Sequence, residues 1–497
     1  MGLKSVVSKP LAKYAMRKFM SAYNDPVASQ LRVLEDLLRH AETTAFGKDH
    51  RFDQLMGPND FAQAIPVRDY EALIPYIDRV KRGESSVLWP GLPMYFCKTS
   101  GTTSGTKYIP LTKDSLPNHI GSARSALFAY IAETGNARFV DGKMIFLQGS
   151  PALEKLPSGI PYGRLSGIVA NHVPSYLQKN RMPSYTTNCI EDWETKLKAI
   201  VRETSSQNMS LISGIPSWVQ MYFEMLLQHN NRTNIREIFP NFDLFVFGGV
   251  NFEPYRAKFK ELIGADIPSI ELYPASEGFI AFQNSQEDDG LLLNVDSGIY
   301  FEFIKADEYF NENPKRYHIG EVELGVNYAL VMSTNAGLWS YSIGDTVKFT
   351  SLNPPKIRVT GRIKHFTSAF GEHVIAEEAE AVMIEAINHF SLRVNEFHLA
   401  PQVNPLDGGL PHHEWIVEWD EQPQNIQAIA EFIHYALAKR NVYYKDLIQD
   451  KVIRTAVITS VERGAFNHFM KKEGKLGGQN KIPRLANDRK IADGILA

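Results

Sequence analysis

The sequence predicts an α/β protein, with a large N-terminal domain of mixed sheets flanked by helices and a small α+β C-terminal domain. Between Pro90 and about residue 272, short apolar segments alternate with segments of helical periodicity. Strands that alternate with helices in this way form layered sheets with parallel pairing. Residues 296–359 are β-rich and are predicted to form a subdomain of the larger domain. After residue 365, helices and strands alternate again in a shorter pattern.

Residues 1–82 are predicted to be mostly helical, because leucines recur at helical spacing from Leu31 to Leu38. Residues 3–20 form a basic amphipathic pattern, with Lys4, Lys9, Lys13, Arg17 and Lys18. Such a helix usually packs on a core, and contact with a membrane surface is the alternative. The segment lacks the apolar run of a secretory signal, and no stretch approaches the ~20 apolar residues of a membrane span.

The remaining elements follow from local periodicity. Buried strands are predicted at Met94–Cys97, Met144–Leu147, Met209–Ile212, Leu244–Phe247 and Ser269–Leu272, with helices around Trp193–Val201 and Trp218–Leu226. The β-rich stretch contains predicted strands at 299–304, 321–324, 329–333, 346–349 and 357–359. The C-terminal domain is predicted to contain helices at 375–390 and 426–439 and strands at 415–419 and 452–459. Gly361–Lys364 is the natural boundary, which gives domains at 1–360 and 365–497.

Composition excludes several classes of protein. The chain has 53 Lys and Arg against 56 Asp and Glu, for a net charge of −3, which disfavours a general nucleic-acid binder. Two cysteines, Cys97 and Cys189, cannot build a disulfide framework, and no Cys/His spacing resembles a zinc site. Two buried thiols in a reducing, cytoplasmic location are expected, and one disulfide between them is the alternative. His412 and His413 are adjacent, so in a strand they would point to opposite faces, and a solvated loop end is the expected setting.

The strongest chemical signal is the segment from Lys98 to Lys107, which has the sequence KTSGTTSGTK and lies between two strand-like segments. Glycines bring backbone N–H groups to an anion, hydroxyls add donors, and lysine adds positive charge, so the segment predicts a phosphate-binding loop. The spacing is not that of a Walker A loop, because Thr106 separates Gly105 from Lys107. The alternative is a surface loop without a ligand.

Three weaker motifs lie further along the chain. Tyr273–Gly278 (YPASEG) comes at the end of a predicted strand, where ligands bind in open α/β sheets, and Glu277 there could hold a divalent ion. Ser-Glu before a helix would equally serve as a helix cap. Gly248-Gly249 follows another strand, and a tight turn explains it equally well. In Tyr341–Asp345 (YSIGD), Asp345 could accept ribose hydroxyls, although Gly-Asp is also typical of a hairpin turn.

Taken in order, these motifs resemble those of the acyl-adenylate-forming superfamily. Within it, the chain is most similar to the auxin-responsive (Gretchen Hagen 3) family of acyl acid amido synthetases, in a short form like those of bacteria. The loop running into Ile109-Pro110-Leu111-Thr112 is particularly similar to that family, as are Ser213–Trp218 (SGIPSW) and Gly248–Tyr255 (GGVNFEPY). The resemblance spans nearly the whole chain.

The resemblance implies roles for individual residues. Thr99, Ser100 and Thr103 match positions that hold the phosphates of ATP, and the rest of that loop is Gly101, Thr102, Ser104, Gly105 and Lys107. Tyr273 and Ala275 match the adenine side, with Ser276 and Gly249 also on the ATP-binding surface. Glu277 matches the carboxylate associated with Mg²⁺, and Asp345 matches the ribose-binding aspartate. Arg362 and Lys364 occupy a hinge pattern, and Lys481 matches a mobile catalytic lysine that acts during adenylation.

The resemblance therefore implies an enzyme that uses ATP and Mg²⁺ to adenylate a small carboxylic acid and then transfers the acyl group to an amino acid. Transfer to coenzyme A, and a non-catalytic nucleotide-binding relative, are the alternatives. Two motifs depart from the family pattern: Pro274-Ala275 stands where many relatives have small polar residues, and Ser342 stands where relatives often have Arg. For the acid, the helix after the phosphate loop, including Arg124, Leu127 and Phe128, and residues 168–173 are the expected lining.

Overall fold

The computed structural model describes residues 2–100, 106–172, 179–249, 252–288, 290–363, 366–367, 369–370, 372, 374–449, 451–476 and 481–497. Contacts divide the chain into two compact units. The first contains Met1–Val250 and Lys260–Val359, and the second contains Asn251–Phe259 and Thr360–Ala497. The assignment of residues 1–360 as a catalytic domain and 365–497 as a mobile cap stays a prediction.

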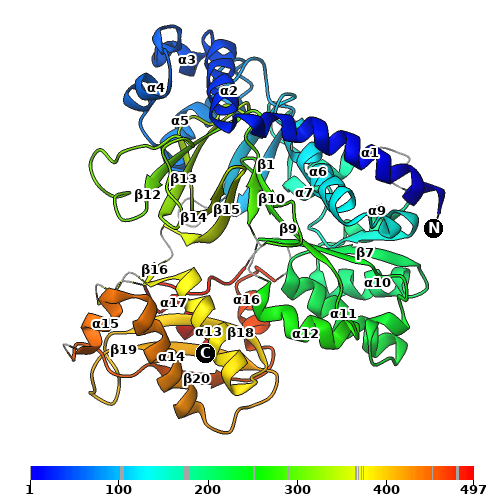
Figure 1. Cartoon of the computed structure of the whole chain (residues 1–497), viewed down its shortest axis with the longest axis vertical. Coiled ribbons are helices and arrows are strands. Elements are labelled where there is room, and N and C mark those ends of the chain that lie inside the picture. Colours follow the sequence, from blue (N-terminus) through cyan, green and yellow to red (C-terminus); the bar gives the residue numbers. More distant parts are fainter. Residues whose placement is uncertain are drawn as a thin grey trace. The chain divides into compact units, whose positions relative to one another are not determined.

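The first unit begins with helices, as predicted. They are α1 (Leu3–Met20), α2 (Pro26–Ala41), α3 (Ala45–Asp49), α4 (Pro58–Ala64) and α5 (Tyr70–Lys81), with short 3₁₀ turns at Ser21–Asn24 and Phe52–Gln54. The carboxylate of Asp25 caps α2 by accepting from Ala28 N, and that of Asp69 caps α5 by accepting from Ala72 N. Helix α1 lies along α6 (Leu116–Thr134), as Figure 1 shows.

One large sheet of eleven strands forms the centre of the first unit, in the order β12-β13-β14-β15-β11-β10-β9-β8-β7-β3-β6. Its parallel half consists of β3 (Lys143–Phe146), β6 (Arg181–Met182), β7 (Met209–Ser213), β8 (Leu244–Gly248) and β9 (Ser269–Pro274). The other half consists of β10 (Phe279–Gln283), β11 (Leu291–Leu293), β12 (Ile299–Lys305), β13 (Asn327–Thr334), β14 (Tyr341–Leu352) and β15 (Pro355–Arg362). The β-rich stretch thus continues the same sheet through the β9–β10 and β11–β15 pairings.

A smaller sheet in the order β2-β1-β5-β4 carries the phosphate-loop segment. Its strands are β1 (Tyr95–Ser100), β2 (Thr106–Leu111), β4 (Glu154–Lys155) and β5 (Pro161–Gly163). The other helices of this unit are α7 (Leu165–Asn171), α9 (Tyr185–Asn188), α10 (Trp193–Thr204) and α11 (Pro216–Asn230), with 3₁₀ turns at Arg138–Asp141 and Ile235–Glu237. Helix α12 (Glu253–Ile263) contributes its first turns to the second unit. The mixed α/β class predicted from the sequence is therefore confirmed.

The second unit contains a three-stranded sheet in the order β18-β19-β20 and a small hairpin, β16-β17. Its strands are β16 (Phe366–Thr367), β17 (Val374–Ile375), β18 (Val394–Gln402), β19 (His412–Trp419) and β20 (Val457–Val461). Its helices are α13 (Ala376–Phe390), α14 (Ile426–Arg440), α15 (Val442–Gln449), α16 (Ala465–Lys472) and α17 (Lys490–Leu496). Helices α13 and α14 pack on each other over a core that includes Trp415 and Tyr444.

Three local predictions are wrong. Residues 321–324 form no strand and share only a single bridge, between Leu324 and Phe349, because the segment turns at His318–Glu321 and leaves Leu324 57% exposed. The last strand, β20, begins at Val457 and not at 452. His412 and His413 are not at a solvated loop end, because both are buried within β19.

Candidate active site

The predicted phosphate loop connects two antiparallel strands. Strands β1 and β2 pair Thr99 with Lys107 and Ser100 with Thr106, so residues 101–105 join the open end of this hairpin. Gly101, Thr102, Thr103, Ser104 and Gly105 lie outside the described residues. A hairpin differs from a Walker A loop, which leads from a strand into a helix. Thr99 and Lys107 thus stand opposite each other at the entrance to the predicted phosphate-binding segment.

The lysines at the two ends of this segment have different surroundings. The Lys107 ammonium lies 5.6 Å from the ring centroid of Tyr70, whose hydroxyl accepts a 2.8 Å hydrogen bond from Tyr108 N. The Lys98 ammonium lies 3.7 Å from a carboxylate oxygen of Glu154, on β4. Because Lys98 is paired with a neighbouring strand, Lys107 is the better placed of the two for an anion at the hairpin end.

Glu277 lies in a tight turn between β9 and β10. Ala275 N donates to the carbonyl oxygen of Gly278 at 2.9 Å, and Gly278 N donates back to that of Ala275 at 3.3 Å. The two bonds enclose Ser276 and Glu277 at the tip of a β-hairpin. The helix-cap alternative for this pair is wrong, because strand β10 follows the turn. Both side chains therefore project from the carboxyl end of the parallel strand β9.

Gly248-Gly249 reaches the same edge of the sheet. Strand β8 runs parallel to β9, with Gly248 opposite Leu272. A Cβ atom at Gly248 would collide with the carbonyl oxygen of Leu272, and Gly249 has a φ of +84°, which side chains rarely adopt. The two glycines allow β8 to end against β9 beside Tyr273 and Ala275.

Asp345 lies within strand β14 and not in a hairpin turn. On β13, Ala329 pairs with Thr346 and Val331 pairs with Ser342, so three residues of β14, from Ile343 to Asp345, oppose Leu330 alone. Gly344 has a φ of +82° in this bulge. A bulge re-aims the side chains of its strand, and such features occur beside active sites. The hairpin-turn alternative for Gly344-Asp345 is therefore wrong.

Two tyrosines connect these motifs reciprocally. The Tyr273 hydroxyl donates to Asp345 Oδ2 at 2.7 Å, and the Tyr341 hydroxyl donates to Glu277 Oε1 at 3.3 Å. Both tyrosines are buried, with 7% and 1% of their surface exposed. Burial, followed by the charge of Glu277, raises the pKa of Tyr341 well above its usual value, so its hydroxyl stays a donor. The YPASEG and YSIGD segments thus position each other's carboxylates.

Glu277 is linked to the hairpin of β1 and β2 through Tyr341, which packs in the same hydrophobic cluster as Phe96 and Cys97 of β1. Burial and, after it, the charge of Glu277 raise the pKa of the Cys97 thiol, which lies on β1 two residues before Thr99. The segment before α5 pairs with the start of β14. Arg68 N donates to the carbonyl oxygen of Ser340 at 2.9 Å, and Ser342 N donates to the carbonyl oxygen of Arg68 at 2.8 Å. Segments far apart in the sequence, from β1, β9, β14 and the start of α5, therefore converge on one region.

The remaining predicted residues, Arg362 and Lys481, belong to the second unit, and Lys364 lies outside the described residues. Arg362 ends β15, directly after Gly361 with its φ of +150°. Lys481 is exposed, and the chain that follows it is firmly anchored. Leu399 N donates to the carbonyl oxygen of Arg484 at 2.8 Å, and the buried Arg484 guanidinium forms ion pairs with Glu380 and Glu396.

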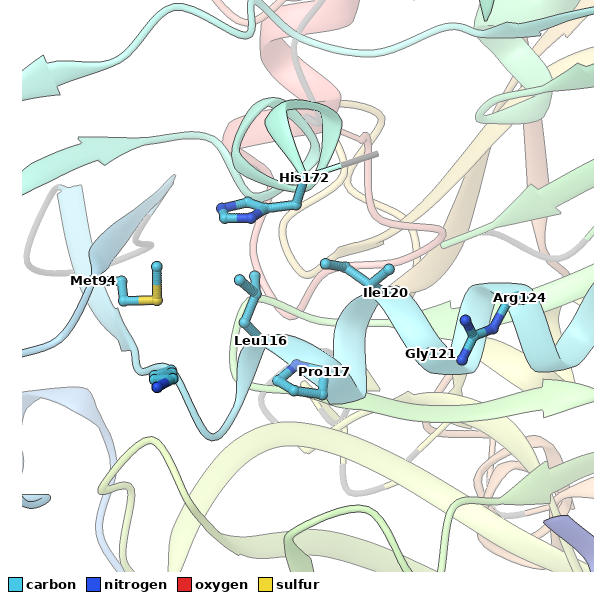
Figure 2. A pocket seen from close by; sticks show the side chains of 8 residues that line it. Met94, Leu116, Pro117, Ile120, Gly121, Arg124 and His172 are labelled. Carbon is cyan, nitrogen blue, oxygen red and sulfur yellow. The ribbon is translucent and has the colours of Figure 1, made fainter. Parts of the chain in front are cut away.

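A pocket of about 350 Å³ lies along α6 (Figure 2). Met94, Leu116, Pro117, Ile120 and Gly121 supply an apolar wall, and Lys113, Arg124 and His172 are the basic groups around it. His172 Nε2 lies 3.1 Å from the hydroxyl of Tyr95. The same helix carries Asn118, whose Oδ1 accepts a 2.6 Å hydrogen bond from Phe279 N, two residues after Glu277. Helix α6 therefore has this pocket along one face and the Glu277 turn beside another.

Sequence reasoning did not single out Tyr70, Arg68, Asn118 or Tyr341 as site residues. Only Tyr341 carried a signal, because it belongs to the YSIGD segment; the others depend on pairings between distant segments. No cluster of three or more His, Cys, Asp or Glu side chains that could hold a metal ion is found in the described part of the chain. Glu277 is a single carboxylate, which could hold a Mg²⁺ ion together with phosphate oxygens and water, the ligands that Mg²⁺ commonly takes.

The chain matches three domain models of one protein family. The GH3 family N-terminal domain matches residues 15–188 and 165–268, the GH3 family central domain matches 292–362, and the GH3 family C-terminal domain matches 377–490. The indole-3-acetic acid-amido synthetase GH3.3 of Arabidopsis thaliana is 20% identical over 538 residues, covering 92% of this chain and 88% of the relative.

Two solved structures show the same fold. The AtGH3.15 acyl acid amido synthetase in complex with 2,4-DB superposes with a TM-score of 0.78 at 18% identity, over 96% of this chain and 95% of that one. A 2-hydroxyisobutyryl-CoA ligase in complex with R3-HIB-AMP has a TM-score of 0.58 at 14% identity, over 94% and 90%. The family domains together match most of the chain, which therefore belongs to the GH3 family, as its motifs predict.

Proposed function

We propose that the protein is an ATP-dependent ligase that joins a small carboxylic acid to an amino acid. In the first step, a carboxylate oxygen of the acid attacks the α-phosphorus of ATP, and pyrophosphate leaves. In the second step, the amino group attacks the acyl carbonyl carbon, an amide bond forms, and AMP leaves. The observation that carries this proposal is the reciprocal pairing of Tyr273 with Asp345 and Tyr341 with Glu277, beside the phosphate-loop hairpin of a GH3 family chain.

The residues of the first unit fit an adenylating site. Asp345 is an acceptor for ribose hydroxyls, held in place by Tyr273. Thr99 and Lys107 stand opposite each other where the hairpin connection begins, so they suit the phosphates. Glu277 is the residue that would hold Mg²⁺, and the ion would supply neutralising charge at the departing pyrophosphate. Ala275, Ser276 and Gly249 lie at the edge where β8 and β9 end, which suits the adenine side.

The acid is proposed to bind in the pocket along α6. Its apolar wall suits a hydrocarbon or aromatic body, and its basic rim suits a carboxylate, because none of the described residues that line it is acidic. This rim includes Arg124, from the helix after the phosphate loop, and His172, from residues 168–173. Both segments are expected from the sequence to line the acid site. The pocket therefore favours a small apolar monocarboxylic acid over a sugar or a highly charged substrate.

Lys481 is proposed as the catalytic lysine of adenylation. Its exposed side chain precedes a segment whose backbone is fixed at Arg484, and a lysine carries its charge at the end of a long, flexible stem that can reach a reacting phosphate. Arg362 and Gly361 suit a hinge, since a glycine with positive φ accommodates dihedral change. We also place the protein in the cytoplasm, because Cys97 and Cys189 are free thiols.

Acid-dependent exchange between pyrophosphate and ATP tests the adenylation step. A panel of aliphatic and aromatic monocarboxylic acids should include at least one that stimulates exchange in the presence of Mg²⁺. Lys481→Ala should slow exchange by about a hundredfold or more while ATP affinity changes little, since loss of a charge acting in the transition state affects rate and not binding. Lys490→Ala, which removes a lysine whose side chain is 88% exposed, is the matched control. No exchange with any acid would favour a non-catalytic nucleotide binder.

A further inference from the structure

The N-terminal helix α1 has two apolar faces. Its inner face packs along α6 through Ala12 and Met16, which are 0% and 8% exposed (Figure 1). The outer face exposes four larger apolar side chains: Val6 at 54%, Val7 at 56%, Leu11 at 50% and Tyr14 at 70%. Packing within the protein accounts for the inner face only. None of the helices in the described part of the chain is long and apolar enough to cross a membrane.

The exposed side chains are ordered along the helix. Val7, Leu11 and Tyr14 are spaced four and three residues apart, which places them on one line along the surface of an α-helix. The same spacing continues to Lys4 before them and to Lys18 after them. The outer face of α1 is therefore a continuous apolar stripe with an ammonium group at each end.

The charge of α1 has one sign. Residues 3–20 contain five basic side chains and no Asp or Glu, although the whole chain has a net charge of −3. The helix is also held in place, because the carboxylate of Asp141 accepts hydrogen bonds from the backbone N–H groups of Gly2 and Ser5, at 2.8 and 3.3 Å. The protein thus presents a fixed, basic and partly apolar helix face to its surroundings.

We propose that this outer face of α1 docks on an anionic phospholipid membrane, with the helix lying in the plane of the interface. An interfacial helix inserts its apolar side chains at the boundary between headgroups and acyl chains, and its basic side chains contact anionic lipids. Tyrosine is enriched at this depth, and lysine side chains extend from it toward the headgroups. Pairing of this stripe with the same stripe of a second copy is disfavoured, because the ammonium groups of Lys4 and Lys18 would approach those of the other copy.

Cosedimentation of the full chain with lipid vesicles tests this proposal. The chain should bind vesicles of phosphatidylcholine mixed with phosphatidylglycerol and should not bind vesicles of phosphatidylcholine alone. Two double variants should each weaken binding by about tenfold or more. Val7→Ser/Leu11→Ser removes the apolar area that would insert, and Lys4→Gln/Lys18→Gln removes the charges that would contact anionic lipids. Leu324→Ser/Leu352→Ser, which removes leucines 57% and 42% exposed outside α1, is the matched control and should bind normally.

The result that would overturn the proposal is equal binding by the full chain and both α1 variants, or no binding to the anionic vesicles. Sedimentation velocity without lipid measures whether the chain dimerises through the same face. A dimer that is lost in Val7→Ser/Leu11→Ser would show that the outer face of α1 binds a second copy of the chain instead of a membrane. The substituted residues are exposed and lie outside the adenylating site, so acid-dependent pyrophosphate exchange should remain unchanged in every variant. Failure of exchange in the unmodified chain would bear on the ligase proposal and not on this one.

Discussion

The hydroxyl of Tyr273 donates a 2.7 Å hydrogen bond to Oδ2 of Asp345, which is 72 residues further along the chain. Tyr341 donates to Glu277 in the opposite direction, across 64 residues. Each motif therefore contributes one tyrosine that positions a carboxylate of the other. The carboxylates proposed to bind ribose and Mg²⁺ are thus each held by one part-buried hydrogen bond, and loss of either tyrosine hydroxyl should affect the carboxylate of the other motif.

Tyr273→Phe should raise the KM for ATP by about fivefold, roughly the 1 kcal/mol of one hydrogen bond, with a smaller effect on kcat. The ring remains in place, so the change is confined to the orientation of Asp345. Steady-state kinetics of pyrophosphate exchange at varied ATP concentration measure the KM for ATP and the kcat separately. Tyr309→Phe is the matched control, because the Tyr309 hydroxyl bonds to Ser342 on the same strand at 2.8 Å. Equal shifts in both variants would contradict the role of Tyr273.

Glu277→Gln should raise the Mg²⁺ concentration needed for half-maximal exchange by about tenfold or more, because a neutral amide is a poor ligand for Mg²⁺. The amide oxygen can still accept from Tyr341, so local structure should be preserved. ATP affinity measured without Mg²⁺ should stay the same. An unchanged Mg²⁺ requirement would place the metal-binding carboxylate elsewhere.

Gly121→Leu should raise the KM for the acid by about tenfold and leave the KM for ATP unchanged. An added Cβ at Gly121 meets no atom within 4 Å, so the larger side chain occupies the pocket without a collision at its base. Replacing a helical glycine should also stabilise the chain, by up to about 1 kcal/mol. Gly121→Ala, which adds one methyl group, should have an intermediate effect. Unaltered acid kinetics in both variants would remove this pocket as the acid site.

Stability of the second unit should fall between pH 6.5 and about pH 4. Burial, and after it the charge of His413, lowers the pKa of His434 from 6.5 to about 4. Below pH 6.5 the unfolded chain therefore binds a proton that the folded chain does not, and the loss reaches roughly 3 kcal/mol at the acidic end. Above pH 6.5 this contribution to stability is fully present.

His434→Gln tests this pH dependence by chemical denaturation across the same range. His434 Nδ1 lies 2.8 Å from the Tyr444 hydroxyl, and a glutamine side chain retains hydrogen-bonding capacity without titrating. The slope of unfolding free energy against pH should decrease in the variant. His229→Gln, at an exposed histidine of α11, should leave the slope unchanged. A slope that is the same in all three proteins would show that His434 is not the titrating group.

The sequence was sufficient for features that depend on local patterns. Apolar segments located β7, β8 and β9, and the order of the motifs indicated the GH3 family. The local setting of Ser276-Glu277 could not be decided, because the same dipeptide suits a helix cap and a hairpin tip, and the pairing of β10 with β9 selects the hairpin. His412 and His413 were expected near solvent, but the buried carboxylate of Glu372, 2.8 Å from His413 Nε2, allows a polar side chain inside the core.

The pairing of Tyr273 with Asp345 could not be predicted for a different reason. It depends on the strand order of an eleven-stranded sheet and on the bulge at Ile343–Asp345. One residue of register shift would turn a strand side chain to the opposite face. Local periodicity contains no information on such long-range register, so the motifs predict candidate site residues but not which of them are in contact.

The identity of the acyl acceptor is the central claim, and product analysis tests it most directly. The chain is incubated with an acid that supports pyrophosphate exchange, ATP, Mg²⁺ and either mixed amino acids or coenzyme A, and the products are identified by mass spectrometry. We expect an N-acyl amino acid and AMP in equal amounts. A coenzyme A thioester without any amide would contradict an amide-forming ligase.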